Sequence, residues 1–270
     1  MPSHKLISAQ LFSELWQTQC EQIISSANLV LRADEDIEMV HQYRIALRKA
    51  RSLLVFMKPL LKVAFFNQVN DQFRQFANHF STVREWDVLL EYYQSTYLEH
   101  VDEDKKLTEY LLEVQRKNRL DAYAHFDAQD TVRAVQTYRK DLEKNGFKHK
   151  AKVIACVTFV RERVKLLRKN IKEKEKRLKL DDFKRIHSYR IANKRLRYAL
   201  ELLNPAFMNA FDKRIKQLKA KTDLLGSRCD LYVMQEDLHK LNAYNNGEMR
   251  SLNDFLAFIS AEMTKNEANG

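Results

Sequence analysis

HQYRIALRKARSL, residues 41–53, and HSYRIANKRLRYA, residues 187–199, are two copies of one pattern. His, Tyr, Arg, Ile and Ala recur at identical offsets, and a lysine or arginine recurs at three further offsets. A repeated core helix requires only apolar residues at matching positions. A repeated histidine and a repeated row of cations therefore indicate a repeated polar task.

Composition predicts an all-α protein. The chain has 270 residues, of which 45% are hydrophobic, enough for one large domain or two fused bundles. Only four glycines and three prolines are present, so we do not expect many tight turns and short strands. Apolar residues recur instead at helical spacing. Helices are expected over residues 6–31, 34–58, 66–83, 88–99, 105–126, 131–143, 150–177, 182–203, 206–225, 231–243 and 251–263.

Polar or rigid residues separate these helices. The acids of residues 34–36 suit a helix N-terminus, and Pro59 and Pro205 lie near the ends of the two motif helices. Asn145 and Gly146 are the best candidates for a midpoint boundary, because glycine readily ends a helix.

The spacing of the two motifs predicts the domain organisation. They are 146 residues apart, which is too far for a solenoid period. We expect a single domain made of two helical halves, residues 1–146 and 147–270, related by a pseudo-two-fold axis.

Three features predict a cytoplasmic protein that does not span a membrane. The longest apolar run, Val153–Val160, is far shorter than a membrane span. Residues 1–5 lead into mixed polar residues without a signal-peptide core. Cys20, Cys156 and Cys229 are odd in number and far apart, so they form neither a disulfide framework nor a zinc-binding spacing.

Positive charge is concentrated in part of the chain. The formal net charge is +11, but residues 148–221 hold 24 basic and 7 acidic residues. The remainder, with 23 basic and 29 acidic residues, is net negative. Residues 39–70 form a second basic island, with six lysines and arginines and no acid. Such local excess favours an anionic partner such as a polyphosphate, a nucleic acid or a lipid surface.

A helix at about 100° per residue aligns the polar residues of each motif. His41, Arg44, Arg48 and Arg51 share an arc of roughly 80°, next to the apolar face of the helix. The second copy repeats this arc, with His187, Arg190, Lys194 and Arg197. Lys49 and Arg195 point to the other side and are either outer contributors or solvated.

A solvated basic face is the simplest alternative. Solvated helices usually interleave glutamates with their cations at helical spacing, but no acid lies between Glu38 and Asp71 or between Asp182 and Glu201. Arginine also suits bidentate phosphate contact. We therefore expect an anion-binding stripe. The lysine-rich run of residues 172–179, in contrast, contains interleaved glutamates and reads as solvated.

Four roles are open for His41 and His187. Each is either a packed structural residue, a hydrogen-bond donor to phosphate, a metal ligand or a phosphorylated catalytic group. Neither has a partner His, Asp or Glu at ligand spacing on its helix, and the adjacent cations would repel a metal. We expect neither a metal site nor a cofactor.

At these residues the sequence resembles the CHAD family, the conserved histidine α-helical domain. Its signature is a histidine followed by a row of cations on one helix, twice per chain. The resemblance extends to residues 81–89, STVREWDVL, and residues 225–233, LGSRCDLYV, which are similar to the family's Leu-Gly-x-x-Arg-Asp-x-Asp-Val segment. Ser81 and Glu85 depart from this pattern, and Cys229 stands where the first copy has Arg84. Asp87 and Asp230 are expected to orient cations or cap helices.

The resemblance implies two four-helix bundles whose basic surface and channel bind inorganic polyphosphate. We expect this binding to be non-catalytic. It also implies association with polyphosphate granules. Some members are fused to a triphosphate-tunnel domain, and this chain resembles the stand-alone form, since no β-rich segment is present. By family pattern the long helices next to the motifs also supply cations, and Arg163, Lys165 and Arg168 would widen the surface. The predicted polyphosphate-binding residues are His41, Arg44, Arg48, Lys49, Arg51, Arg74, Arg84, His187, Arg190, Lys194, Arg195, Arg197 and Lys219.

Two other functions are open. The same charge would serve an RNA or DNA backbone, although no exposed aromatic platform is evident. A phosphatase or phosphotransferase that uses the two histidines would require carboxylates, a metal or a phosphate-binding loop near the phosphate, and no such set is found. The oligomeric state cannot be read from the sequence.

Overall fold

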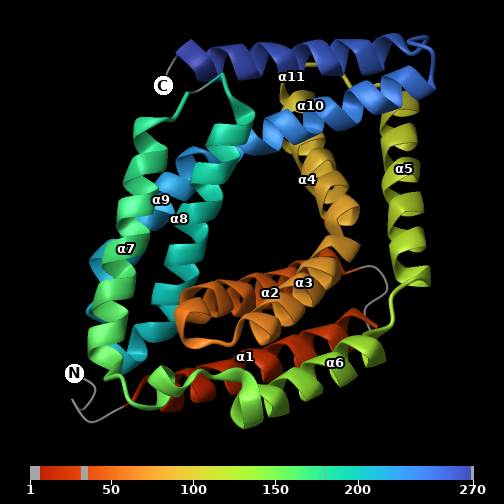
Figure 1. Cartoon of the computed structure of the whole chain (residues 1–270). Coiled ribbons are helices and arrows are strands. Elements are labelled where there is room, and N and C mark those ends of the chain that lie inside the picture. Colours follow the sequence, from red (N-terminus) through yellow and green to blue (C-terminus); the bar gives the residue numbers. More distant parts are fainter. Residues whose placement is uncertain (1–6, 32–35, 180, 269–270) are drawn as a thin grey trace. The chain divides into compact units, whose positions relative to one another are not determined.

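The computed structural model describes residues 7–31, 36–179 and 181–268 (Figure 1). Within these residues the regular structure is helical, and extended pairing is limited to two isolated β-bridges, Ile7 with Ala155 and Leu61 with Phe147. The predicted all-α class is confirmed. Residues 1–5, where the sequence shows no signal-peptide core, and the acids at positions 34 and 35 lie outside the described residues.

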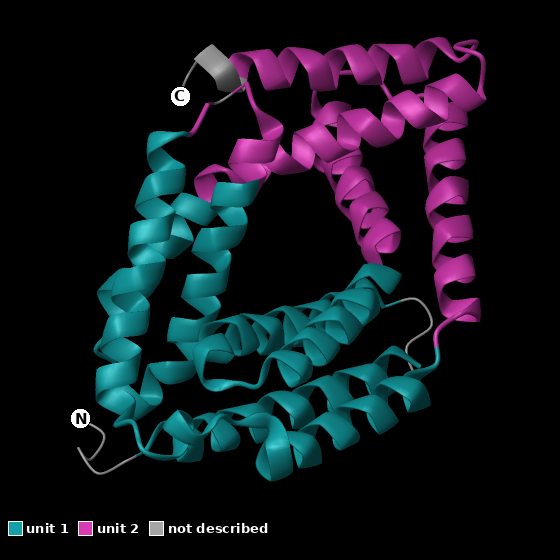
Figure 2. Ribbon diagram, viewed as in Figure 1, with its two compact units in different colours: residues 1–79, 127–177, 188–222 teal, residues 80–126, 178–187, 223–270 magenta. Residues whose placement is uncertain are grey.

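The chain forms two compact units (Figure 2). Unit 1 comprises residues 1–79, 127–177 and 188–222, and unit 2 comprises residues 80–126, 178–187 and 223–270. Each unit draws on both predicted sequence halves. The units and the sequence repeat are therefore different divisions of the chain, and the pseudo-two-fold relation of the halves stays a prediction.

Unit 1 is built on a core of aromatic side chains. Trp16 stacks on Phe73 with ring centroids 5.7 Å apart, and Phe12 meets Phe159 edge-on at 5.6 Å. Helix α1 packs on α2 and α6, and α2 packs on α3. The helices of this unit are α1 (Ser8–Val30), α2 (Ile37–Met57), α3 (Val63–His79), α6 (Ala128–Asp141), α7 (Cys156–Lys176) and the larger parts of α8 (Phe183–Leu203) and α9 (Asp212–Leu224).

Unit 2 has a separate hydrophobic core. Phe255 lies at its centre, fully buried, with the rings of Tyr93 and Tyr97 at 5.2 and 4.6 Å. The helices that contribute to it are α4 (Ser81–Ser95), α5 (Lys105–Ala124), α10 (Gly226–Tyr244) and α11 (Arg250–Ala268). The amide of Asn245 also donates a hydrogen bond of 2.8 Å to the hydroxyl of Tyr110.

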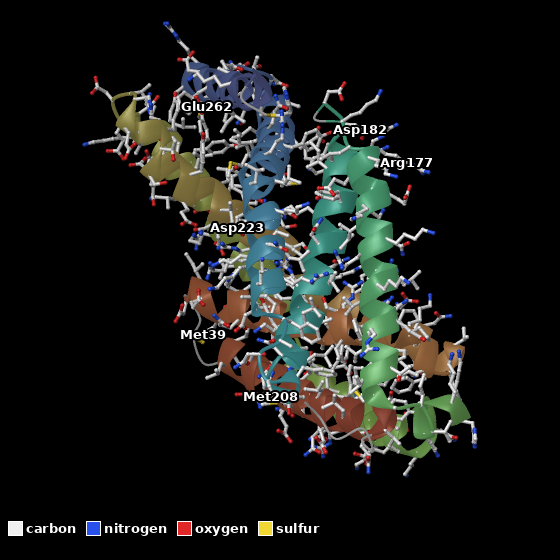
Figure 3. All side chains as sticks on the ribbon, turned by 90° about the vertical axis from the view of Figure 1, so that its left-hand side faces the viewer. Met39, Arg177, Asp182, Met208, Asp223 and Glu262 are labelled. Carbon is white, nitrogen blue, oxygen red and sulfur yellow. The ribbon has the colours of Figure 1, made fainter. Side chains whose placement is uncertain are left out.

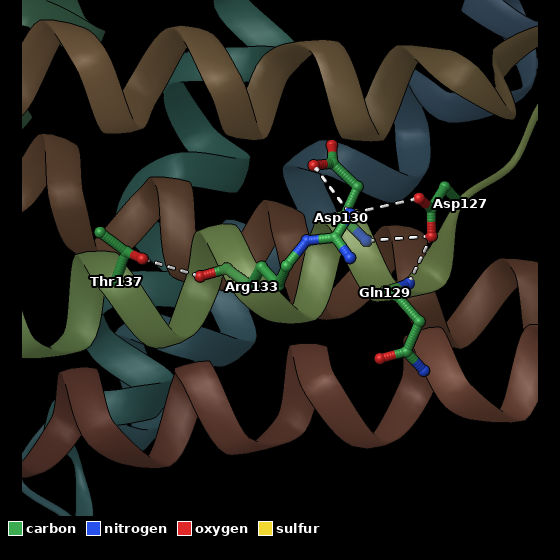
Figure 4. A network of polar contacts seen from close by, with 5 residues as sticks. All are labelled: Asp127, Gln129, Asp130, Arg133 and Thr137. Atoms are coloured by element: carbon green, nitrogen blue, oxygen red, sulfur yellow. Dashed lines mark hydrogen bonds and ion pairs between the residues drawn. The ribbon is translucent and has the colours of Figure 1, made fainter.

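Aspartates begin several helices. The Asp36 carboxylate accepts the backbone N–H of Glu38 at 2.8 Å, so the predicted acidic start of α2 is confirmed at this residue. Asp127 caps α6 in the same way, with Gln129 N–H at 2.7 Å and Asp130 N–H at 3.0 Å (Figure 4). Arg133 adds an ion pair of 3.4 Å to Asp127.

Prolines and a glycine end helices where the sequence predicts. Pro59 and Pro205 lie in short 3-10 turns, Lys58–Leu60 and Pro205–Phe207, directly after the motif helices. Gly146 ends a π-helical turn, Leu142–Gly146, in which a Cβ atom at Gly146 would lie 2.9 Å from Leu142 Cδ1. A further short 3-10 turn, His149–Lys152, precedes α7.

The cysteines are free and buried. Burial raises the pKa of Cys20 to about 12 and that of Cys156 to about 11, so both are neutral thiols near pH 7. No helix in the described part of the chain is both long enough and apolar enough to cross a membrane.

Candidate functional site

Both copies of the repeated motif are helical throughout, as predicted. Residues 41–53 lie within α2, and residues 187–199 lie within α8. Within unit 1, residues 188–203 of α8 lie beside α7, and Figure 3 shows these two helices facing the viewer. Lys174 of α7 reaches the hydroxyl of Ser188 at 2.6 Å.

The repeated arginine at the fourth position of each motif contacts the end of another helix. Arg44 is only 9% exposed, and its guanidinium donates to the carbonyl of Ala77, in the last turn of α3. Arg190 is half-buried and directs its Nε at the carbonyl of Thr222, in the last turn of α9, at 3.5 Å. The last carbonyls of a helix have no partner within the helix and carry partial negative charge. Part of the repeated polar task is therefore structural.

A third arginine contacts the backbone carbonyls at the end of α2. Arg163 of α7 donates from Nε to the Phe56 carbonyl at 3.0 Å and from Nη2 to the Val55 carbonyl at 2.8 Å. Burial lowers the pKa of this guanidinium. By family pattern Arg163 is expected to widen an anion-binding surface, but two of its donors lie on backbone carbonyls of α2.

The repeated tyrosine joins each motif helix to a neighbour. The hydroxyls of Tyr43 and Thr131 are 3.1 Å apart and share a hydrogen bond between α2 and α6. Burial raises the pKa of Tyr43. Tyr189 donates to the carboxylate of Glu175 on α7 at 2.9 Å. The tyrosines, like the arginines, fix the position of the two motif helices.

Three arginines from three helices form a cluster of like charge, which we call the arginine cluster. It consists of Arg51 on α2, Arg74 on α3 and Arg195 on α8. Burial lowers the pKa of Arg51, the charge of Arg195 and then that of Arg74 lowers it further, and Asp71 opposes them. The Nε atom of Arg51 is buried without a hydrogen-bond partner.

The other two members of the arginine cluster are accessible. Arg195 is exposed, although partial burial lowers the pKa of its guanidinium. Arg74 is exposed and forms a pair of 3.8 Å with Asp71, a distance at which surface pairs contribute little. The sequence predicted all three residues, and the structure brings cations from both motif copies together.

Comparisons with known proteins identify the fold. The sequence profile of the CHAD domain matches residues 14–239, which is most of the chain. The chain belongs to the CHAD family. The fold is also similar to the crystal structure of the CHAD domain from the plant Ricinus communis, with a TM-score of 0.76 and 22% identity over 96% of this chain and 88% of that one. PptA from Streptomyces chartreusis gives a TM-score of 0.73 and 13% identity over 98% and 96%. A comparison with curated proteins gave no match.

The two histidines of this CHAD domain have different surroundings. His41 is half-buried on α2. His187 is exposed, and its ring lies 5.5 Å from that of Phe183, one turn earlier on α8. The predicted binding role of the two histidines stays a prediction.

The remaining cations of the motifs lie at intermediate depth. Arg197 pairs with Glu201 at 3.6 Å and stacks over the ring of Tyr198 at 4.7 Å. The exposed fraction of the Arg197 side chain is only 14%, and both of these contacts are with residues of α8 itself. Of the other predicted residues, Arg48, Lys49 and Lys194 are half-buried and Lys219 is exposed.

Arg84 belongs to unit 2, where it lines a pocket of about 520 Å³ between α4, α10 and α11. Three carboxylates, those of Glu91, Asp230 and Glu262, line the same pocket. The immediate surroundings of Arg84 are therefore more acidic than those of the arginine cluster. A role for Arg84 in anion binding stays a prediction.

Asp87 orients a cation, as predicted. This carboxylate is buried on α4, and its Oδ1 accepts hydrogen bonds from Arg119 at 2.9 Å and from Gln115 at 2.8 Å, both on α5. The ion pair is nearly inaccessible, with side-chain exposures of 10% for Arg119 and 1% for Asp87. Asp87 therefore ties α4 to α5.

The sequence identified Arg168 as a possible surface cation but not the group of cations to which it belongs. A pocket of about 130 Å³ between α7, α8 and α9 is lined by Arg168, Lys172, Arg214 and Lys221. Residues 172–177 and 179 are exposed, in agreement with their predicted solvation, and Glu175 also accepts hydrogen bonds from Lys221 and Tyr189. Helical spacing of cations on α7 and α9 was the available signal. Among the described residues, no group of three or more His, Cys, Asp or Glu side chains is arranged to hold a metal ion.

Proposed function

We propose that this chain binds inorganic polyphosphate, without catalysing a reaction on it, through cations of α2, α3 and α8. The arginine cluster carries the proposal. Its three guanidinium groups come from three helices, and burial followed by the charges of Arg195 and Arg74 lowers the pKa of Arg51. Cations held together in this way gain stability when an anion lies among them.

Arginine is suited to a polymer of phosphates. Its planar guanidinium contacts two phosphate oxygens at once, and each charge-assisted hydrogen bond contributes about 1.5–3 kcal/mol. Every phosphate along the polymer offers the same oxygens, so contacts accumulate with chain length rather than with sequence. Binding should weaken as salt increases, by analogy with counterion release from nucleic acids.

The helices that carry the cluster are held in place by other arginines. Arg44 contacts the last turn of α3, and Arg163 contacts the last turn of α2. Preorganised donors lose less conformational freedom when the ligand binds. The basic residues thus divide into one group that fixes the helices and another that is available to an anion.

Polyphosphate binding would place the protein at polyphosphate granules in the cytoplasm, as the CHAD family suggests. RNA is the alternative polymer, because its backbone also offers regularly spaced phosphates. A phosphatase or phosphotransferase that uses His41 and His187 is the alternative enzyme. The experiment must therefore include RNA and a measurement of phosphate release.

The test is a binding titration of long-chain polyphosphate, beside RNA of matched phosphate content, at low and physiological salt. The wild-type chain should bind polyphosphate at both salt concentrations and RNA far more weakly. The double variant Arg51→Glu, Arg195→Glu should bind polyphosphate at least about 100-fold more weakly, because two charged contacts become repulsive.

A charge-matched control separates a site from general attraction. Lys106 and Lys117 are exposed on α5, in unit 2, and Lys106→Glu, Lys117→Glu changes the net charge equally. This control should retain most of the affinity. Equal losses in both double variants, or equal binding of RNA and polyphosphate that disappears with salt, would contradict the proposal. Release of orthophosphate by the purified protein would contradict a non-catalytic function.

A further inference from the structure

The pocket between α7, α8 and α9 lies on a different side of α8 from the arginine cluster. Asn193 and Arg195 are two residues apart, so they are separated by about 200° around the helix axis. Asn193 lines the pocket, whereas Arg195 belongs to the cluster. Both lie in unit 1. We call this pocket, of about 130 Å³, the α7–α9 pocket.

The α7–α9 pocket carries an excess of positive charge. Arg168, Lys172, Arg214 and Lys221 line it, with Glu175 as the lining acid. Burial and then the charge of Arg168 lower the pKa of Arg214. Glu175 is shared between Lys221 and Tyr189, and the hydrogen bond from Lys221 is the main reason that its pKa is lowered. The pocket therefore suits an anion with more than one negative charge.

A buried acceptor also belongs to one of the residues that line this pocket. Asn193 is fully buried, and its Nδ2 donates to the Tyr189 carbonyl at 2.9 Å, which fixes the orientation of the amide. Its Oδ1 is buried without a hydrogen-bond partner. The first motif has Leu47 at the matching position, so the acceptor is specific to this copy. A buried acceptor without a partner costs free energy, which a ligand with a proton to donate would recover.

Few phosphates combine several negative charges with a proton to donate. A phosphate inside a polyphosphate chain has no O–H group. A terminal phosphate does, because its second ionisation has a pKa of about 6, as in phosphate monoesters, and a fraction stays protonated near neutral pH. The end of a polyphosphate chain and free orthophosphate share this chemistry.

We propose that the α7–α9 pocket binds a terminal phosphate group, with Asn193 Oδ1 accepting a hydrogen bond from its O–H group and the side chains of Arg168 and Arg214 binding its other oxygens. This inference rests on the proposed function. The arginine cluster holds internal phosphates of the polymer, and the pocket recognises an end. Chains with free ends are thereby distinguished from rings, which have none.

The test compares linear tripolyphosphate with cyclic trimetaphosphate by calorimetric titration at fixed ionic strength. The wild-type chain should bind the linear ligand about tenfold more tightly. Asn193→Ala should remove this preference. It leaves the charge of the protein unchanged, so the greater charge of the linear ligand cannot explain the loss. Arg214→Gln should also weaken the binding of linear tripolyphosphate. This second variant keeps the test valid if Asn193→Ala does not fold.

An orthophosphate arm identifies the source of the terminal group. If Asn193→Ala weakens the binding of orthophosphate, the pocket is a site for free phosphate. If Asn193→Ala weakens only the binding of linear tripolyphosphate, the pocket recognises the end of a chain. Equal binding of linear and cyclic ligands by wild type, or an undiminished preference in folded Asn193→Ala, would overturn the proposal. If the wild-type chain still binds long-chain polyphosphate, the proposed function is supported even when the pocket proposal fails. If the wild-type chain does not bind long-chain polyphosphate, the proposed function itself is refuted.

Discussion

Arg44 and Arg190 occupy the same position of the two motifs and contact equivalent places, but with different burial. Arg44 is almost fully buried against α3, whereas Arg190 is half-buried and its contact with Thr222 is long. Arg44→Ala should therefore lower the free energy of unfolding by about 2 kcal/mol, because a charged hydrogen bond is lost and a helix-end carbonyl is left without it. Arg190→Ala should cost less than about 1 kcal/mol. Urea denaturation measures both.

Lys49→Ala, at a half-buried position on α2, is the control for loss of a cation and should change stability little. Small and equal effects of Arg44→Ala and Arg190→Ala would mean that the carbonyl contacts are not important for stability.

The sequence could not separate the arginines that contact other helices from those that we propose to bind a ligand. Arg44 and Arg51 lie within about 20° of each other around α2, but about 10 Å apart along its axis. Helical periodicity predicts their shared face. It does not predict that the end of α3 lies opposite Arg44 while Arg74 and Arg195 lie near Arg51. Those differences arise from tertiary packing.

At the scale of elements, most helix ends follow from single residues. Asp36 begins α2, Pro59 follows its end, and Gly146 ends a helical turn at the chain's midpoint. The prediction was wrong between residues 66 and 99, where a continuous apolar stripe hides the junction of α3 and α4 at Phe80. Phe80 precedes α4 without a side-chain cap, so α4 begins at Ser81 rather than Val88.

The contact between α4 and α5 gives a test at this scale. Asp87→Ala should lower the free energy of unfolding by about 3–5 kcal/mol, because it leaves the Arg119 guanidinium buried without its carboxylate. The double variant Asp87→Ala, Arg119→Met should recover a large part of that loss, since no buried charge then remains. A double variant as unstable as the single one would show that packing rather than charge dominates this contact.

At the scale of the whole molecule, the charge count overstates the cations available to a ligand. Residues 148–221 carry a large positive excess, yet Arg163 and Arg190 in this segment contact backbone carbonyls, and Lys221 pairs with Glu175. Net charge favours an anionic partner, which stays a prediction. It cannot predict which cations the fold uses for itself.

The stability of the whole chain should report on the arginine cluster. Arg51→Met replaces a desolvated cation near Arg195 and Arg74 by an uncharged flexible side chain. Without ligand, the melting temperature should rise by about 1–3 °C, as expected for a gain of under 1 kcal/mol in a chain of this size. Saturating polyphosphate should raise the melting temperature of wild type through preferential binding to the folded state, and raise that of Arg51→Met much less.

Lys117→Met, on the exposed face of α5, controls for the loss of one positive charge and should leave both melting temperatures close to those of wild type. A lower melting temperature for ligand-free Arg51→Met would mean that Arg51 supports the fold. An undiminished polyphosphate response in that variant would place the polymer elsewhere on the molecule. A stability gain paired with a weaker ligand response is the result expected if repulsion among the three arginines is retained for anion binding.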